Sequence, residues 1–151
     1  MQAVIFIGIQ ASGKSTFCRD RFFKTHIRIN LDMLKTRHRE KIILQACLKA
    51  KQPFVVDNTN PTREDRARYI GPAKDARFRL IGYYFESILE DCKRRNAQRT
   101  GKARIPIPGI AATYKKLILP SYAEGFDELY SVKISEKSDS AFIVEEWPDE
   151  I

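Results

Sequence analysis

The feature that most constrains this chain is a nine-residue run, Gly8 to Thr16, that reads Gly-Ile-Gln-Ala-Ser-Gly-Lys-Ser-Thr. The run satisfies the pattern G-x-x-x-x-G-K-[ST] at every defined position. The apolar residues 3–7 before it are typical of a short buried strand, and residues 15–23 after it are expected to form a helix. A strand, a loop and a helix in this order are the setting in which the pattern forms a phosphate-binding loop, or P-loop. A glycine-rich turn with a chance Lys-Ser pair would not require these flanks.

Each part of this loop has a physical role in binding a nucleoside triphosphate. The two glycines let successive backbone N–H groups point toward phosphates, and the helix N-terminus adds partial positive charge. Lys14 is expected to reach the β- and γ-phosphates, and the Ser15 hydroxyl is expected to ligate Mg²⁺. We therefore predict a nucleotide site made by the loop residues Gly8, Gln10, Ala11, Ser12, Gly13, Lys14, Ser15 and Thr16.

The rest of the chain alternates strand-like and helical patterns, which is typical of an α/β fold with a central, mainly parallel sheet flanked by helices. Strands are expected at residues 26–30, 54–56 and 79–85, with a terminal hairpin at 129–134 and 141–145. Helices are expected at 34–50, from Thr62, from Ser87 to about 99, and at 110–119 ended by Pro120. Thr62 with Asp65, and Ser87 with Glu90, have the spacing of capping boxes. The length predicts one domain over residues 1–151.

A basic segment at about residues 96–109, framed by Gly and Pro, is expected to form a lid. Phosphoryl transfer spreads negative charge over the equatorial oxygens, and an arginine above the site stabilises that charge. Arg99 is the first candidate, with Arg95 and Arg104 behind it. The alternative for each is a solvated basic helix end, which the helix dipole also favours.

Charge is distributed unevenly along the chain. Residues 1–120 hold 25 Lys and Arg against 10 Asp and Glu, a net +15, and residues 121–151 hold 2 against 9, a net −7. A basic body of this size attracts polyanions and favours contact with nucleic acid. The alternative is that the basic residues only solvate helix faces. The role of the acidic C-terminal segment, 121–151, is left open.

Other classes of protein are disfavoured by composition. The three cysteines, Cys18, Cys47 and Cys92, are odd in number and lack metal spacing, so we expect reduced thiols and no structural zinc. No apolar run has the length of a membrane span, and no secretory leader precedes the first strand. We therefore expect a cytoplasmic protein with no membrane contact.

Two aspartates follow expected strands, and the carboxyl ends of strands are where open α/β sheets bind ligands. Asp32, after the second strand, is the candidate general base, because transfer to a hydroxyl needs a carboxylate that deprotonates it. Its alternative role is to cap a helix starting near Met33. Asp57, after the third strand, is the candidate partner of Ser15 in holding Mg²⁺. Its alternative role is turn formation, because the run that follows is rich in turn residues.

Polar residues beside these aspartates have two interpretations that the sequence does not separate. Asn58, Thr59 and Asn60 either hydrogen-bond a substrate or stabilise the turn that they form.

With these residues, the chain resembles a known family, the P-loop kinase domain of the phage and animal polynucleotide 5′-hydroxyl kinases that heal DNA and RNA ends. The similarity runs from the P-loop to about Phe126. Besides the P-loop, it is carried by Ile29-Asn30-Leu31-Asp32, by Asp57-Asn58-Thr59-Asn60-Pro61, by Arg95-Asn96-Ala97-Gln98-Arg99 and by the segment 120–126. The Asp-Asn-Thr-Asn-Pro and Arg-Asn-x-x-Arg segments are more selective than the P-loop, which many kinases share.

The resemblance implies a P-loop kinase fold, ATP as phosphate donor, Mg²⁺, and nucleic acid with a 5′-hydroxyl end as acceptor. It implies that Asp32 is the general base and that Arg99 contacts the ATP phosphates. We also predict that Arg95 binds the nucleotide. A basic residue after the aspartate binds substrate in relatives, for which Lys35, Arg37 and Arg39 are all candidates here. The chain departs from the family in two ways: Leu31 stands where an arginine is expected, and no Asp-x-Asp-x-Thr phosphatase motif occurs.

Two other functions compete with this hypothesis. A P-loop kinase of a small hydroxyl metabolite or nucleoside would share the fold and the phosphate chemistry, but it would not need the net charge of +15. A nucleotide-binding regulator would bind nucleotide and nucleic acid without transferring phosphate. The Asn-Lys-x-Asp motif that reads guanine in GTPases is absent, which argues against a GTP switch.

Overall fold

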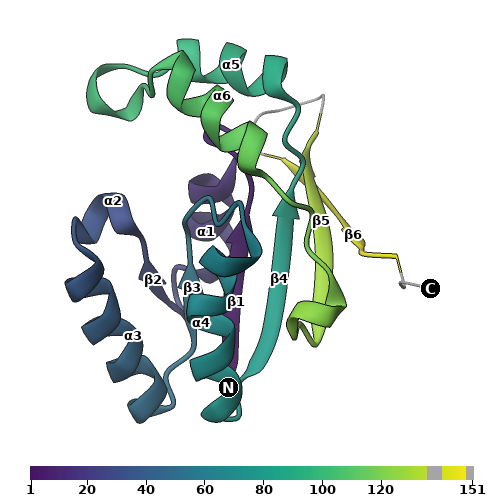
Figure 1. The fold of residues 1–151 in the computed structure, drawn as a ribbon. Helices are drawn as coiled ribbons and strands as arrows, with labels where there is room; N and C mark the ends of the chain where they lie inside the picture. The colour runs from purple at the N-terminus through teal and green to yellow at the C-terminus, as the bar shows by residue number, and fades with distance from the viewer. Residues whose placement is uncertain (136–140, 149–151) are drawn as a thin grey trace.

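The computed structural model describes residues 1–135 and 141–148, and its centre is one six-stranded sheet (Figure 1). The strand order is β2-β3-β1-β4-β5-β6. Neighbouring strands are parallel up to β5, and β6 pairs antiparallel with β5 at the edge. The bounds are β1 Gln2–Ile7, β2 Ile27–Ile29, β3 Phe54–Val56, β4 Arg79–Phe85, β5 Glu128–Ile134 and β6 Phe142–Glu146. The expected mainly parallel sheet and its terminal hairpin are therefore confirmed.

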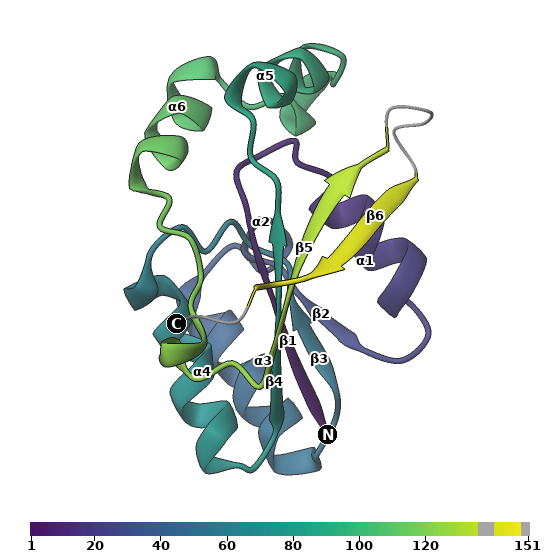
Figure 2. The same ribbon diagram turned by 90° about the vertical axis from the view of Figure 1, so that its right-hand side faces the viewer.

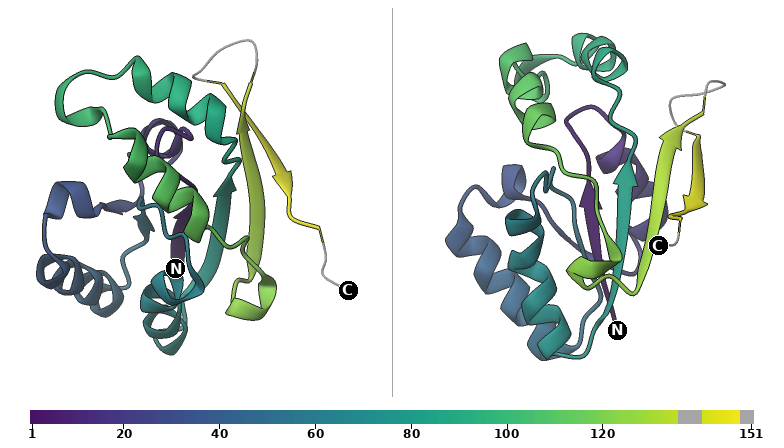
Figure 3. Two further views of the ribbon diagram at one scale, coloured as in Figure 1. Left: turned by 45° about the horizontal axis from the view of Figure 1, so that its top comes forward. Right: turned by 45° about the vertical axis from the view of Figure 1, so that its right-hand side comes forward.

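Helices cover both faces of this sheet (Figure 2). α3 (Arg37–Ala50) and α4 (Arg63–Asp75) lie on one face, and α1 (Lys14–Phe22) lies on the other. α5 (Leu89–Ala97) and α6 (Ile107–Lys116) lie beyond the carboxyl ends of the strands (Figure 3). The short elements are α2 (Leu31–Leu34) and two 3₁₀ turns, η1 (Gly101–Ala103) and η2 (Tyr122–Glu124).

Covering both faces explains why the central strands are apolar throughout. On β1, Ala3, Ile5 and Ile7 join the core beneath α3 and α4. Val4 and Phe6 join the core beneath α1, where Phe6 packs edge-on against Phe17. The alternation of a strand thus divides one continuous apolar run between two cores.

The expected helix over residues 34–50 is wrong in its first part, because the chain forms two helices there. Lys35 has φ 75°, in the left-handed region, and it closes α2. Thr36 is extended, and its hydroxyl accepts a hydrogen bond from Arg39 N, which caps α3. Asn30 caps α2 by accepting from Met33 N at 2.9 Å, so the capping role considered for Asp32 belongs to Asn30.

Local capping signals succeeded at one helix and failed at another. Thr62 and Asp65 form the expected capping box of α4. Ser87 and Glu90 do not form one, because α5 begins after Ile88 without a side-chain cap. The Ser87 hydroxyl instead donates to Phe85 O and accepts from Ile9 N in the P-loop.

The expected helix at 110–119 starts three residues earlier and ends at Lys116. Its termination is not caused by Pro120, since Leu117 is already extended, with ψ 121°. The three cysteines are free and buried, as expected of packed thiols. Within the described part of the chain, no helix is long and apolar enough to cross a membrane.

A buried ion pair connects α4 to the segment that leads into β5. Arg66 is fully buried, and its Nε lies 2.7 Å from Glu124 Oε1. Arg66 Nη1 also donates to the backbone oxygens of Asn60 and Ile118. A buried charge is tolerated only when it is paired and hydrogen-bonded. The pair therefore fixes the turn after β3 and the chain after α6 to one helix.

Replacing Glu124 with alanine is expected to lower the free energy of unfolding by about 3–5 kcal/mol, because it leaves Arg66 as an unpaired buried charge. Urea unfolding followed by circular dichroism measures the change. The matched control is Glu90→Ala, which breaks an exposed pair with Lys93 and should cost less than about 1 kcal/mol. Equal effects of the two substitutions would contradict this account.

Candidate active site at the P-loop

The P-loop connects β1 to α1 in a conformation that depends on small residues. Gly13 has φ 98° and Ala11 has φ 62°, so both lie in the left-handed region. A Cβ at Gly13 would approach Phe142 to 2.9 Å, and one at Gly8 would approach Phe85 Cβ to 3.0 Å. The backbone at both glycines thus lies close to neighbouring side chains. The loop leads directly into the N-terminus of α1, the end of a helix at which anions bind.

Lys14 is turned into this loop. Its Nζ donates to Gly8 O at 2.8 Å and to Ile9 O at 2.7 Å. Burial lowers the pKa of Lys14 from 10.5 to about 8, with the carboxylate of Asp57 acting in the opposite direction. The charges of Arg99 and Asp32 also act on this ammonium group, which places both residues in its electrostatic neighbourhood. Four of the predicted site residues therefore share one electrostatic environment.

Asp57 is the most buried acid of the site and follows β3 directly. Its side chain is only 1% exposed, and Oδ2 accepts from Ser15 Oγ at 3.1 Å. The two residues predicted to hold a metal thus lie side by side. A hydroxyl and a carboxylate are oxygen donors that suit Mg²⁺, which is usually held by one or two carboxylates together with substrate phosphates. This pair fits that use, and no cluster of three or more His, Cys, Asp or Glu occurs among the described residues.

Arg28 is a further member of the site that the sequence reasoning missed. Its Nε donates to Asp57 Oδ2 at 2.8 Å, and its Nη2 lies 3.3 Å from Ser15 Oγ. The sequence shows only that Arg28 is the one charged residue of β2, because its partner Asp57 becomes a neighbour through the pairing of β2 with β3.

The three polar residues after Asp57 hold neighbouring strand ends together. Asn58 Oδ1 accepts from Leu31 N at 2.8 Å, Thr59 O accepts from Gly8 N at 3.0 Å, and Asn60 Nδ2 donates to Phe6 O at 2.8 Å. Each of these three residues therefore has a specific hydrogen-bond partner, which supports the interpretation that they stabilise the turn. Substrate contact by Asn58 and Asn60 stays a prediction.

Asn58 also joins a buried polar network that the sequence did not reveal. Asn58 Nδ2 and the Tyr69 hydroxyl both donate to Glu40 Oε2, at 3.2 and 3.0 Å. Arg37 donates to Glu40 Oε1 at 2.8 Å. Burial, with the carboxylate nearby, raises the pKa of Tyr69, so its hydroxyl stays a neutral donor. Glu40 is 2% exposed. The sequence did not indicate this burial, since a single Glu in a helix is ordinarily solvated.

Asp32 differs from Asp57 in being exposed. It lies in α2, and its carboxylate makes no hydrogen bond or ion pair with the described residues. Of the basic candidates that follow it, Arg37 is held by Glu40, and Arg39 Nη1 donates to Leu34 O. Lys35 is exposed, and its side chain has no partner in the described structure.

The two helices that flank the predicted lid segment, α5 and α6, contact the P-loop. Arg95 Nη1 donates to Ala11 O at 3.2 Å, and Gln10 Nε2 donates to Thr113 Oγ1 at 3.0 Å. Arg99 and Arg104 instead donate to backbone oxygens within the segment itself, Ala103 O and Ala97 O. Arg95 therefore lies on the loop already, whereas Arg99 is held within the lid.

The fold and this site are those of a P-loop nucleotide-binding domain of the kinase type. Comparison with known proteins gives its family. A family model described as AAA domain (AAA_33) matches residues 4–117, and the chain belongs to that family. A bifunctional polynucleotide phosphatase/kinase from Schizosaccharomyces pombe is 28% identical over 136 residues, which cover 87% of this chain and 33% of that protein. The chain thus spans about a third of the length of that relative.

Two solved structures share the fold at low identity. Kti12 from Chaetomium thermophilum, solved with ADP-AlF3, has a TM-score of 0.65 and 16% identity, covering 89% of this chain and 92% of that one. A gluconokinase from Sinorhizobium meliloti has a TM-score of 0.61 and 16% identity, covering 89% and 83%. The predicted P-loop kinase fold is therefore confirmed.

The lowered pKa of Lys14 predicts that nucleotide binding takes up a proton above about pH 8. The nucleotide-free protein loses the Lys14 proton as the pH rises through 8, whereas phosphates favour the charged form and raise its pKa. Affinity for ADP should therefore fall by up to about tenfold per pH unit between pH 8 and 10. Calorimetry at pH 9 in buffers of different ionisation enthalpy measures the uptake.

Lys14→Met should remove this proton uptake, and Lys49→Met, at an exposed position on α3, should leave it unchanged. Heats that do not depend on the buffer for the unsubstituted protein at pH 9 would contradict this prediction, because they would show that the protonation state of Lys14 does not change on binding.

Proposed function

We propose that this chain is an ATP-dependent kinase that transfers the γ-phosphate of ATP to the 5′-hydroxyl end of DNA or RNA. The observation that carries the proposal is the convergence of three strand ends. The P-loop follows β1, Asp57 follows β3 beside Ser15, and the segment with Asp32 follows β2 and is tied to Asn58. The P-loop, the Ser15–Asp57 pair and the exposed carboxylate of Asp32 thus lie at one edge of the sheet, which supports the groups that we assign to phosphoryl transfer.

In this mechanism, Asp32 accepts the proton of the 5′-hydroxyl as its oxygen attacks the γ-phosphorus, and the bond to the β-phosphate oxygen breaks to release ADP. Asp32 is exposed and has no bonded partner among the described residues, which leaves its carboxylate available to an incoming hydroxyl. Lys14 and Arg99 stabilise the charge on the transferring phosphoryl group, with Arg95 beside them. Ser15 and Asp57 would hold Mg²⁺, which neutralises phosphate charge when bound.

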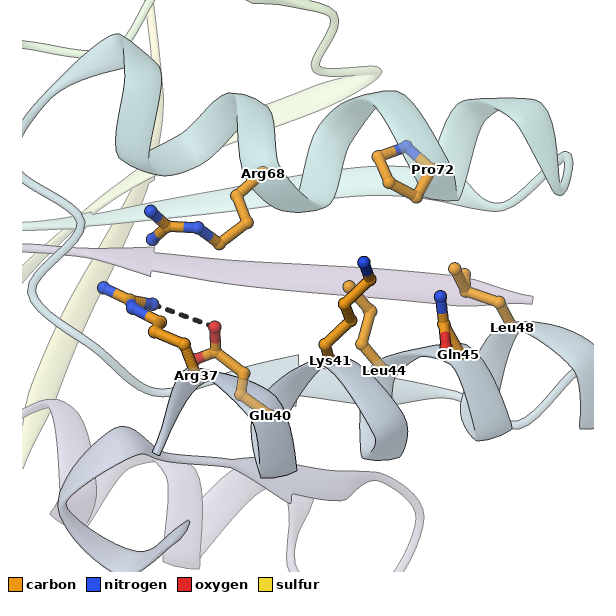
Figure 4. Close-up of a pocket in the computed structure, with 8 residues that line it drawn as sticks. All are labelled: Arg37, Glu40, Lys41, Leu44, Gln45, Leu48, Arg68 and Pro72. Carbon is orange, nitrogen blue, oxygen red and sulfur yellow. Dashed lines mark hydrogen bonds and ion pairs between the residues drawn. The ribbon is translucent and has the colours of Figure 1, made fainter. Parts of the chain in front are cut away.

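A polynucleotide acceptor is supported by the surface that continues from Asp32. A hollow of about 400 Å³ lies between α3 and α4, lined by the cations Arg37, Lys41 and Arg68 (Figure 4). The acid that lines it, Glu40, is buried and already bonded by Arg37, Asn58 and Tyr69. The hollow therefore presents positive charge, and its Arg37 end belongs to the network that Asn58 joins to the backbone of Leu31, the residue before Asp32. We assign the strand beyond the 5′ end to this hollow, with Lys35 and Arg39 as further candidates for contact with it.

A small hydroxyl metabolite is the second candidate acceptor. The likeness to a gluconokinase concerns the fold, which both candidates share. The net charge of +15 on residues 1–120 favours the polynucleotide, as does the likeness to the polynucleotide phosphatase/kinase from Schizosaccharomyces pombe. The two candidates differ in salt dependence, because phosphate contacts along a strand release counterions and a small acceptor makes few of them.

Asp32→Asn is expected to lower the rate of labelled γ-phosphate transfer to a 5′-hydroxyl oligonucleotide by roughly 10²–10⁴-fold, since the amide cannot accept the proton. Nucleotide binding should be unchanged. Matched DNA and RNA oligonucleotides rank the two acceptors, and Asp75→Asn, at an exposed site at the end of α4, is the control. Near-normal transfer by Asp32→Asn would refute its role as base, and transfer only to small hydroxyl compounds would refute the polynucleotide acceptor.

Arg68→Gln tests the strand path. Loss of one phosphate contact should weaken oligonucleotide binding uniformly across sequences and reduce the salt slope, d log K/d log[salt], by about 1. Fluorescence anisotropy from 50 to 200 mM salt measures both. Arg77→Gln removes the same charge just after α4, outside the hollow, and should leave the slope nearly unchanged. If the two variants behave alike, the strand does not follow the hollow.

A further inference from the structure

The contacts of Arg28 raise a question that the proposed phosphoryl transfer does not answer. Arg28 Nε and Nη2 bond to Asp57 Oδ2 and Ser15 Oγ, at 2.8 and 3.3 Å. These are the same two side chains that fit a divalent metal. A positively charged side chain of the protein thus occupies the oxygen donors that a metal would use.

The two partners of this ion pair differ in their freedom to separate. The side chain of Asp57 is 1% exposed, whereas that of Arg28 is 36% exposed. Asp57 is also fixed through its backbone, since its N–H donates to Ile29 O and its carbonyl accepts from Asn30 Nδ2. Arg28 is held at one end by β2, and its guanidinium can swing toward solvent. Any rearrangement of the pair must therefore come from Arg28.

The described structure gives Asp57 no other cationic partner. Lys14, the nearest alternative by sequence motif, donates to the backbone oxygens of Gly8 and Ile9. A buried carboxylate without a cation carries a large desolvation cost. Arg28 therefore compensates the charge of Asp57 in the nucleotide-free protein, which a metal would otherwise have to do.

We propose that Arg28 is an internal counter-ion that competes with Mg²⁺ for Asp57 and Ser15, so that the metal binds appreciably only together with nucleotide. This inference rests on the proposed metal-binding role of Ser15 and Asp57. Without nucleotide, Mg²⁺ gains one carboxylate and one hydroxyl but must displace a charge-assisted hydrogen bond. With nucleotide, the phosphates add further oxygen ligands and negative charge, which favour the metal over the guanidinium.

The first test is Mg²⁺ binding to the nucleotide-free protein. Arg28→Gln should lower the half-saturating Mg²⁺ concentration by about tenfold, which is the scale of one lost hydrogen bond to a charged group. Titration calorimetry and the rise of Tm with MgCl₂ at constant ionic strength both measure this concentration. Arg28→Gln should also have a lower Tm than the unsubstituted protein without metal, and Mg²⁺ should restore it selectively.

Two further variants make the result specific. Lys49→Gln removes the same charge from an exposed position on α3 and should leave Mg²⁺ binding unchanged. Arg28→Lys keeps the charge but replaces the planar two-point contact with one ammonium group, so its half-saturating concentration should fall by about threefold. Arg28→Lys also carries the test if Arg28→Gln does not fold.

The outcomes separate this inference from the proposed function. If Mg²⁺ strengthens ADP binding but no Arg28 variant binds Mg²⁺ more tightly than the unsubstituted protein, the competition is refuted and the metal role of Ser15 and Asp57 stands. If Mg²⁺ strengthens ADP binding in none of the proteins, the metal role itself fails, and the inference about Arg28 fails with it.

Discussion

The arrangement of the carboxyl-terminal edge of the sheet depends on the pairing of one buried carboxylate, that of Asp57. A charge that is 1% exposed must be paired and hydrogen-bonded, and each of its partners comes from a different element. Ser15 comes from the first turn of α1, and Arg28 comes from β2. The ion pair and the hydrogen bond therefore fix the position of the P-loop helix relative to two strands.

The residues after Asp57 extend this constraint to the other strand ends. Asn60 hydrogen-bonds to the backbone near the end of β1, Thr59 to the first glycine of the P-loop, and Asn58 to the start of α2. Asn60 has φ 45°, a conformation that asparagine tolerates better than most residues. This turn-rich sequence thus joins the strand ends, because two of its side chains and one of its carbonyl groups replace the backbone partners that strands lose where they end.

Much of the fold was predictable because its signals are local. Gly13 and the apolar run before it lie within a few residues of the structure that they specify, and so do Thr62 and Asp65. Ser87 has an equally good local pattern, but its hydroxyl bonds to Ile9 N, 78 residues away. Arg28 and Glu40 likewise act through partners that the fold alone brings near. Motifs were therefore enough to predict the candidate site, whereas the partners that compensate its buried charges were not predictable.

The lid segment divides its contacts in a way that bears on the proposed role of Arg99. The base of the lid, formed by the flanking helices α5 and α6, is anchored on the P-loop. An apolar cluster of Ile9, Ala11, Cys92 and Ile110 and the hydrogen bonds of Gln10 and Arg95 hold it there. Gln10 Oε1 and Arg95 Nε are buried and have no hydrogen-bond partner among the described residues, which costs free energy.

The tip of the lid, which holds Arg99 and Arg104, differs, because in the described part of the chain these two side chains bond to carbonyls of the lid segment alone. Movement of the tip would break none of the described bonds to the sheet, whereas movement of the base would disrupt a packed cluster. A phosphoryl-transfer site needs a fixed loop for the phosphates and a cation that approaches the transferring group. An anchored base that carries a separately held arginine meets both needs without moving the loop.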